Sequence, residues 1–267
     1  MDLMLTLKAM LLAVLCGVTE FLPVSSNGHV IIMDEVLGFQ GPPGKLFEIS
    51  LQLGSILAVC WLYRAKLLHT VKHIIDGRTD QRFVINVFLA FAPAALIGFF
   101  FHHFIIEHLF NAKVVATMLV VGGFGILAVE KWKPLPLITN IDDLSPKRAL
   151  LIGLFQSLSM IPGVSRSAST IMGAMLLKVE RKTAAEFSFL LAIPMIFTAS
   201  FFDLFIHRHE LTTHGLALIA TGFVIAFFCA MLVVQWLLGF ISRHGFVPFA
   251  WYRIVAGSVV LALLLTR

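Results

Sequence analysis

Long apolar segments limit what this chain can fold into, because most of them can only be buried in a lipid bilayer. The chain has 267 residues, of which 59% are hydrophobic and 13% charged, and its mean hydropathy is +0.94. This combination excludes an ordinary soluble domain. The sequence also lacks the ten-residue strands of alternating polarity that a membrane β-barrel requires. We therefore expect an all-α polytopic membrane protein.

The apolar segments are of two kinds. Six are long enough to cross a bilayer, which takes about 20 residues with some tolerance, and they cover 47–63, 83–104, 113–130, 185–206, 215–240 and 248–265. The other four form two pairs, 3–22 with 24–38 and 149–161 with 164–177. Each pair is interrupted by proline and small polar residues, at 23–28 and at 162–169. We predict six transmembrane helices and two re-entrant helical hairpins.

The two halves of the chain resemble each other. The segment GVTEFLPVSSNGH from Gly17 parallels GLFQSLSMIPGVSRSAST from Gly153, and FEISLQLGSILAV parallels EFSFLLAIPM. Each half contains one broken hairpin and three spans, and three crossings invert the second copy. We predict a single membrane domain made of two inverted repeats, about 1–135 and 145–267, whose broken hairpins meet near the midplane. Polar side chains and non-helical backbone are tolerated there only around an enclosed or watered cavity.

Basic residues set the expected orientation. Positive charge in short loops marks the cytoplasmic side of a membrane protein. The connection 64–82 is rich in such residues, namely Arg64, Lys66, Lys72, Arg78 and Arg82. With this connection inside, both termini lie outside. The first hairpin then enters from outside and the second from the cytoplasm.

The side chains at the two breaks suit an anion. The first break supplies Glu20, Ser25, Ser26, Asn27 and His29, and the second supplies Ser165, Arg166, Ser167 and Ser169. A new helix is expected to open at about Gly28 and at about Ser167, and the free N–H groups of a helix start attract anions. The guanidinium of Arg166 can hold two phosphate oxygens at once. If the breaks face each other, they form a cradle for an oxyanion, most naturally a phosphate.

The remaining side chains of the breaks suggest chemistry on that phosphate. Glu20 would repel an anion unless it holds a proton or a cation such as Mg²⁺ or Ca²⁺, and Mg²⁺ commonly needs only one or two protein carboxylates. His29 can attack phosphorus or act as a general acid and base. Ser26 is the competing nucleophile, with His29 as its base. A lone histidine in a membrane helix can also serve simply as a hydrogen-bonded tie between helices.

At these residues the chain closely resembles the undecaprenyl-diphosphate phosphatase family, the bacterial bacitracin-resistance proteins. The resemblance rests on motifs in order along nearly the whole chain: TEFLPVSS followed by GH, FE followed by LQLGSILAV, PG followed by SRS, EFSFLLA and FVPFAWYR. It implies a multi-pass enzyme of the bacterial inner membrane that cleaves undecaprenyl diphosphate to undecaprenyl phosphate and phosphate. That reaction recycles the lipid carrier for peptidoglycan synthesis and confers bacitracin resistance. The active site is expected to open to the periplasmic side.

The resemblance also assigns roles to residues. It implies Glu20, Ser26, His29 and Arg166 as catalytic groups. Phosphate-binding residues are expected to be Ser25, Asn27, Gly28, Ser165 and Ser167. The expected cofactor is Mg²⁺ or Ca²⁺, held by Glu20 and Glu48. The expected partners are undecaprenyl diphosphate and membrane lipid, not nucleic acid, and a homodimer stays open.

Three positions depart from the family pattern. A second glutamate usually stands one helical turn before Glu20, where this chain has Cys16; Asn27 replaces a usual threonine and Ala168 a usual glycine. A thiol is a poor ligand for a hard cation. Either Glu48, which the repeat pairs with Glu186, supplies the missing charge, or activity is weak, or the protein has drifted to a related task. The alternatives to a phosphatase are a polyprenyl-phosphate transporter or flippase, since such proteins use broken helices in inverted repeats, and a catalytically silent lipid-binding homologue.

Overall fold

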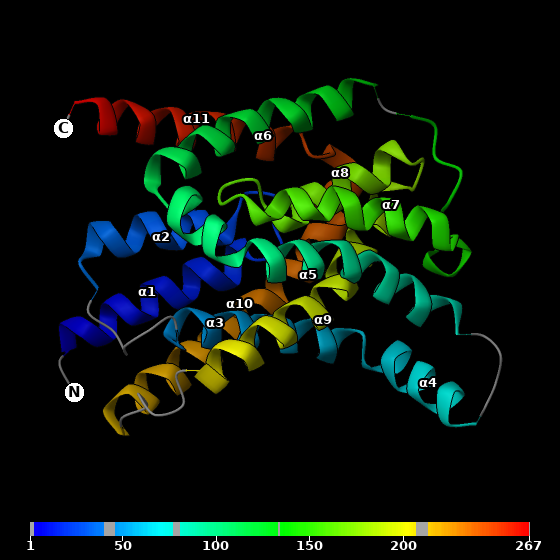
Figure 1. Cartoon of the computed structure of the whole chain (residues 1–267), viewed down its shortest axis with the longest axis horizontal. Helices are drawn as coiled ribbons and strands as arrows, with labels where there is room; N and C mark the ends of the chain where they lie inside the picture. The colour runs from blue at the N-terminus through cyan, green and yellow to red at the C-terminus, as the bar shows by residue number, and fades with distance from the viewer. Residues whose placement is uncertain (1–2, 40–45, 77–80, 133, 207–212, 267) are drawn as a thin grey trace.

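The fold is a bundle of helices, seen here in a computed structural model that describes residues 3–39, 46–76, 81–132, 134–206 and 213–266. Pairing of extended backbone within these ranges is limited to one bridge between Ile138 and Val179. The helices are α1 (Leu3–Thr19), α2 (Ser26–Leu37), α3 (Leu46–Leu62), α4 (Arg64–Ile75), α5 (Arg82–Leu109), α6 (Ala112–Trp132), α7 (Pro146–Ser157), α8 (Arg166–Leu176), α9 (Arg181–Ile206), α10 (Thr213–His244) and α11 (Val247–Leu265). Figure 1 shows their arrangement.

The membrane-spanning helices lie where the apolar segments predicted them. Five helices within the described ranges, α5, α6, α9, α10 and α11, are long and apolar enough to cross a bilayer. The helix α3 provides a sixth crossing when it is taken together with α4, from which it is separated by a bend of 77°. The expected all-α polytopic membrane protein is confirmed.

The connection 64–82 differs from its expected form, because most of it is the helix α4 rather than a loop. None of the side chains of α4 is buried, and Leu68, Val71 and Ile75 are exposed along it. Lys66 joins α4 to the rest of the protein through an ion pair with Asp142, with 2.7 Å between Nζ and Oδ1. Arg78, one of the basic residues used for the orientation, lies outside the described residues. The mixture of apolar and basic side chains is typical of a helix at a membrane surface.

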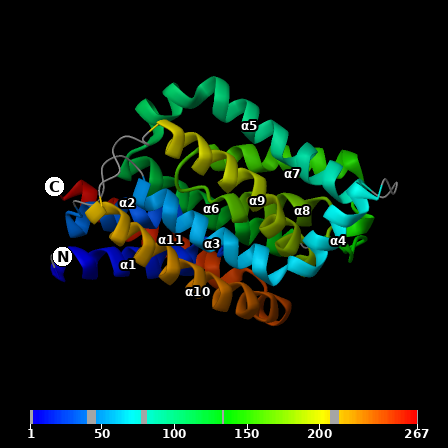
Figure 2. The ribbon, with the colours of Figure 1, turned by 90° about the horizontal axis from the view of Figure 1, so that it is seen from below.

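Both predicted helical hairpins are present. The first is α1 and α2 with non-helical backbone between them, and the second is α7 and α8 with a short 3-10 helix, Leu158–Met160, in its break. The hairpins lie toward opposite ends of the bundle and their breaks meet in the middle, as Figures 1 and 2 show. The two hairpins thus enter the bundle from opposite ends, and their non-helical breaks lie next to each other.

The hairpins pack in a reciprocal way. Helix α1 packs on α10, the middle span of the second half, while α7 packs on α5, the middle span of the first half. Both contacts depend on a glycine: a Cβ atom at Gly17 would lie 2.7 Å from the carbonyl oxygen of Ala226, and one at Gly153 would lie 2.4 Å from that of Ala90. Gly17 and Gly153 are the two residues from which the sequence parallel starts. The division into two inverted repeats, about 1–135 and 145–267, stays a prediction.

We expect Gly153→Ala to destabilise the protein, because its Cβ would overlap the backbone of α5. Overpacking of this kind typically costs about 1–3 kcal/mol. The matched control is Gly239→Ala, since a Cβ at Gly239 meets nothing within 4 Å and alanine is the better helix former. Thermal unfolding of the purified proteins in detergent measures the difference, and equal melting temperatures for both variants would contradict the close approach of α7 to α5.

Candidate active site

The two breaks enclose a cavity of about 200 Å³. Its polar lining comes from both hairpins and from α3, and consists of Glu20, Ser25, Ser26, Asn27, Gln52, Ser159, Ser165 and Arg166. Its apolar lining includes Phe110, Met160, Met195, Ile196 and Ala199. The structure therefore brings the side chains of the two distant breaks to one small polar cavity inside an apolar bundle.

An unusual serine starts each of the inner helices. Ser25 has φ 73° and precedes α2, and Ser165 has φ 77° and precedes α8. Backbone of this kind costs a non-glycine residue on the order of 1–3 kcal/mol and is typical of functional sites. The helices begin at Ser26 and Arg166, one or two residues earlier than the predicted starts at Gly28 and Ser167.

The starts of these helices are capped differently. The hydroxyl of Ser165 accepts a hydrogen bond from the N–H of Ala168 at 3.2 Å. The side chain of Ser25 makes no such cap. The first N–H groups of a helix have no partner within the helix, so α2 presents uncapped donors beside the cavity. This favours an anionic ligand at its start.

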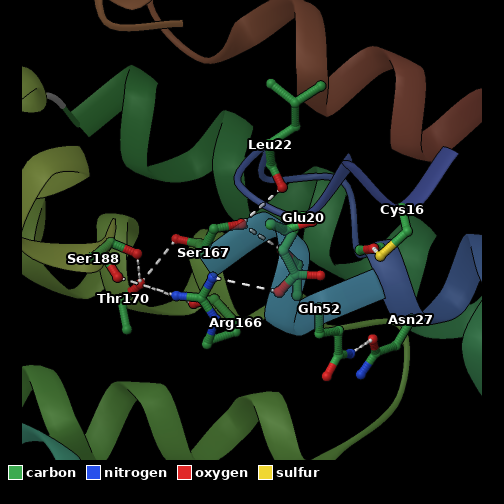
Figure 3. Close-up of polar contacts among 12 residues, drawn as sticks. Cys16, Glu20, Leu22, Asn27, Gln52, Arg166, Ser167, Thr170 and Ser188 are labelled. Atoms are coloured by element: carbon green, nitrogen blue, oxygen red, sulfur yellow. Dashed lines mark hydrogen bonds and ion pairs between the residues drawn. The ribbon is translucent and has the colours of Figure 1, made fainter. Parts of the chain in front are cut away.

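Glu20 and Arg166 form a buried pair of opposite charges across the cavity. Oε1 of Glu20 lies 3.7 Å from Nη2 of Arg166, which is close enough for attraction but too long for a hydrogen bond. Nη1 of Arg166 donates to the carbonyl of Ser188 at 3.1 Å, and Figure 3 shows the guanidinium between these two residues. Oε2 of Glu20 and Nη2 of Arg166 are buried and have no hydrogen-bond partner within the described part of the chain. An acceptor and a donor are thus left for a ligand.

Cys16 and Ser26 lie beside this pair. The hydroxyl of Ser26 donates to Sγ of Cys16 at 3.7 Å, and Cys16 is only 2% exposed. Nε2 of Gln52, which also lines the cavity, donates to Oδ1 of Asn27 at 2.6 Å. Ser26 therefore reaches the cavity with its hydroxyl donating to a weak sulfur acceptor, while Asn27 is held by Gln52 of α3.

His29 does not line the cavity. Its Nδ1 lies 2.8 Å from the carbonyl oxygen of Ser25, and its Nε2 lies 2.7 Å from the hydroxyl of Tyr252 in α11. Because a carbonyl can only accept, Nδ1 carries the proton and Nε2 accepts from Tyr252. The ring also stacks on Tyr252 with centroids 5.5 Å apart. In this arrangement His29 ties two helices together, and its catalytic role stays a prediction.

Three other predicted residues, Ser167, Ser169 and Gly28, do not line the cavity. The hydroxyl of Ser167 donates to the carbonyl of Leu22 at 2.7 Å and so joins the second break to the first. The hydroxyl of Ser169 donates to the carbonyl of Ser165 at 2.9 Å. A Cβ at Gly28 would lie 2.9 Å from a methyl group of Val115, so α2 and α6 approach closely there.

The residues fit a divalent cation only in part. Glu20 lines the cavity and has an unpaired oxygen, but Glu48, in the first turn of α3, and Glu186, in α9, are not among the lining residues. Within the described ranges, no three His, Cys, Asp or Glu side chains lie close enough together to hold a metal ion. One carboxylate suits an ion such as Mg²⁺ that takes its other ligands from phosphate and water.

Sequence reasoning missed several residues of the site. Gln52 lines the cavity, while Tyr252 and Arg253 brace the first break from outside it. Each was visible as a polar residue within a quoted motif, LQLGSILAV or FVPFAWYR. A polar side chain inside an apolar span is a signal of function or of a buried hydrogen bond.

The fold and the cavity together define a polytopic membrane protein with a polar cavity built from two helix breaks. The comparison with protein families gives a specific match. The model of the bacitracin resistance protein BacA family covers residues 9–259. The chain belongs to this family.

Curated relatives match over almost their whole length. An undecaprenyl-diphosphatase of Methylobacillus flagellatus is 46% identical over 98% of this chain and 99% of the relative. One from Parvibaculum lavamentivorans is 48% identical over 96% of this chain and 95% of the relative. Undecaprenyl-diphosphatase 2 of Paramagnetospirillum magneticum is 48% identical over 98% of this chain and 100% of the relative.

We expect inorganic pyrophosphate to stabilise the protein through the cavity. A ligand that binds only the folded state adds about 1.4 kcal/mol of stability at ten times its dissociation constant. Arg166→Gln should lose this stabilisation, because it removes the unpaired donor Nη2. Arg64→Gln is the control, since Arg64 stacks on Trp61 and lies outside the cavity. Thermal shifts with and without pyrophosphate measure the effect, and an equal shift in both variants would place the anion elsewhere.

Proposed function

We propose that this protein is an integral-membrane phosphatase that hydrolyses undecaprenyl diphosphate to undecaprenyl phosphate and phosphate. The observation that carries the proposal is the pair of buried, unpartnered atoms, Oε2 of Glu20 and Nη2 of Arg166, in one cavity between two helix starts. Unpaired buried polar atoms are costly, and more so when they are charged. A phosphate group satisfies the donor, and a proton or cation satisfies the acceptor. The substrate follows from the names of the relatives.

The residues of the cavity have different roles in phosphoryl transfer. Arg166 binds the terminal phosphate, and the uncapped N–H groups of α2 stabilise the charge that its oxygens carry. Such reactions depend mainly on positioning and on charge stabilisation. Gln52 orients Asn27 toward the same group.

Of the two candidate nucleophiles, the geometry favours Ser26, because Ser26 lines the cavity and His29 does not. Oγ of Ser26 forms a bond to the terminal phosphorus while the bond from phosphorus to the bridging oxygen breaks. Undecaprenyl phosphate leaves, and the hydroxyl proton passes to one carboxylate oxygen of Glu20. Water then hydrolyses the phosphoserine. His29 could serve as base only after its ring leaves Tyr252.

A divalent cation, Mg²⁺ or Ca²⁺, would be held by Glu20, and it would supply positive charge to the phosphate oxygens. Glu48 would contribute only through a change of side-chain position, since it does not line the cavity. This chain's own contribution is the guanidinium of Arg166 together with the helix starts.

The proposed setting is the bacterial inner membrane, with the cavity open to the periplasmic side. Phe110, which lines the cavity, directly follows α5 at the connection to α6, and the distribution of basic residues predicts that this connection lies outside. The polyprenyl chain would lie in the bilayer while its diphosphate enters from the side. The product returns the lipid carrier to peptidoglycan synthesis, and its formation would confer bacitracin resistance.

Release of phosphate from undecaprenyl diphosphate by the pure protein in detergent tests the proposal, with and without a chelator. A transporter or flippase would release none but would move the lipid between leaflets of a vesicle. A silent homologue would bind the substrate without turnover. Either result would overturn the proposal.

We expect Arg166→Lys to lose most phosphate release, because an ammonium group cannot contact two oxygens in the geometry of a guanidinium. Loss of one transition-state contact commonly lowers the rate roughly 100-fold or more. Steady-state rates, together with size-exclusion profiles that establish folding, measure the effect. Near-normal turnover by a folded Arg166→Lys protein would refute the role of the cradle.

We expect Cys16→Glu to increase the apparent affinity for Mg²⁺ or Ca²⁺. Residue 16 lies one helical turn from Glu20 and next to Ser26, so the new carboxylate would reach a cation held by Glu20. Cys16→Gln is the matched control, because it adds nearly the same volume without the charge. The measurement is phosphate release against divalent-ion concentration. If both variants fold and share the ion dependence of the unmodified protein, Glu20 holds no catalytic cation.

A further inference from the structure

Arg253, in α11, is the most completely buried charge in the described part of the chain, with 0% of its surface exposed. Its guanidinium makes five hydrogen bonds, and every acceptor is a backbone carbonyl. Nη1 donates to Pro23 at 3.0 Å and to Val164 at 3.0 Å, Nη2 to Gly163 at 2.8 Å and to Met118 at 3.1 Å, and Nε to Leu119 at 3.3 Å. No carboxylate within the described ranges forms an ion pair with it.

The positions of these carbonyls are informative. Pro23 lies in the first break, two residues before Ser25. Gly163 and Val164 lie in the second break, and Val164 directly precedes Ser165. One guanidinium therefore contacts the backbone just before both of the serines with positive φ, and the bonds to α6 hold it in place.

We propose that Arg253 is a positioning residue that fixes the two breaks relative to each other. It does not line the cavity, so it acts through the backbone and not on the substrate. Glu20 and Ser26 belong to one break and Arg166 to the other. The separation of these groups across the cavity therefore depends on the bonds that Arg253 makes to both sides. The consequence for turnover rests on the phosphatase function proposed above.

The surroundings of Arg253 require a guanidinium. Lysine has three donors on one nitrogen, whereas arginine has five donors in a rigid plane, and all three nitrogens of Arg253 are engaged. Room for the group comes from Gly122 in α6, where a Cβ atom would lie 2.0 Å from Nη2. Any side chain at residue 122 would push the guanidinium from its carbonyls.

Gly122 permits a test that leaves the arginine itself unchanged. Gly122→Ala displaces the guanidinium, whereas Gly125→Ala is a matched control on the same helix, because a Cβ at Gly125 meets nothing within 4 Å. Arg253→Lys is the second variant, and it tests the same role of Arg253 if Gly122→Ala does not fold. Each purified protein is assayed for kcat and KM of phosphate release, for melting temperature, and for amide hydrogen exchange of peptides covering 20–27 and 161–168.

The proposal expects Gly122→Ala and Arg253→Lys to lower kcat about tenfold or more with a smaller change in KM, because small displacements of reacting groups are costly. Both should also speed amide exchange in the two breaks, while Gly125→Ala matches the unmodified protein. Unchanged exchange in the breaks would overturn the proposal, whether or not the melting temperature falls, and so would unchanged kcat in an active protein. If the unmodified protein releases no phosphate, the proposed function fails, and amide exchange alone still decides the role of Arg253.

Discussion

The structure depends on one constraint: backbone that leaves a helix inside a membrane must find its hydrogen bonds within the protein. Each hairpin breaks its helix deep in the bundle, and each break exposes carbonyls and N–H groups. Carbonyls of both breaks are satisfied from the side away from the cavity, by Arg253 and by the hydroxyl of Ser167. The N–H groups at the start of α2 are left uncapped by Ser25. Donors therefore remain on the side of the cavity, where the proposed phosphate would bind.

Charge balance follows from the same geometry. The cavity contains one carboxylate and one guanidinium, Glu20 and Arg166, so these two charges cancel before any ligand binds. A lipid diphosphate brings further negative charge into a region of low dielectric, where unbalanced charges are expensive. The helix starts offset part of this charge. We propose that a cation or a proton at Glu20 offsets the rest, and Cys16, in place of the second glutamate expected from the family resemblance, leaves a smaller negative charge to hold such a cation.

Much of this arrangement could be predicted from the sequence, because hydropathy determines spans and proline with small polar residues marks a break. The six residues Glu20, Ser25, Ser26, Asn27, Ser165 and Arg166 were predicted together and do line one cavity. The direction in which each side chain points could not be predicted from the sequence. Nothing in the spacing of SSNGH shows that His29 points to Tyr252, since that contact joins residues 223 positions apart. The helix α4 was missed because its basic residues resemble those of a loop, and Arg253 because its partners are backbone carbonyls, which no side-chain pattern reveals.

The two breaks have similar backbones but different side chains, and so they supply different functional groups to the cavity. Ser25 and Ser165 are alike in having a positive φ directly before a helix. Counting from these serines, the next residues, Ser26 and Arg166, occupy equivalent positions on opposite sides of the cavity. Five residues before Ser25 the chain has Glu20, whereas five residues before Ser165 it has Met160. A repeated frame thus places a hydroxyl and a carboxylate on one side and a guanidinium on the other. An anion held by Arg166 would then face Ser26, and a substitution that moves one half relative to the other should impair the reaction even where every side chain of the cavity is kept.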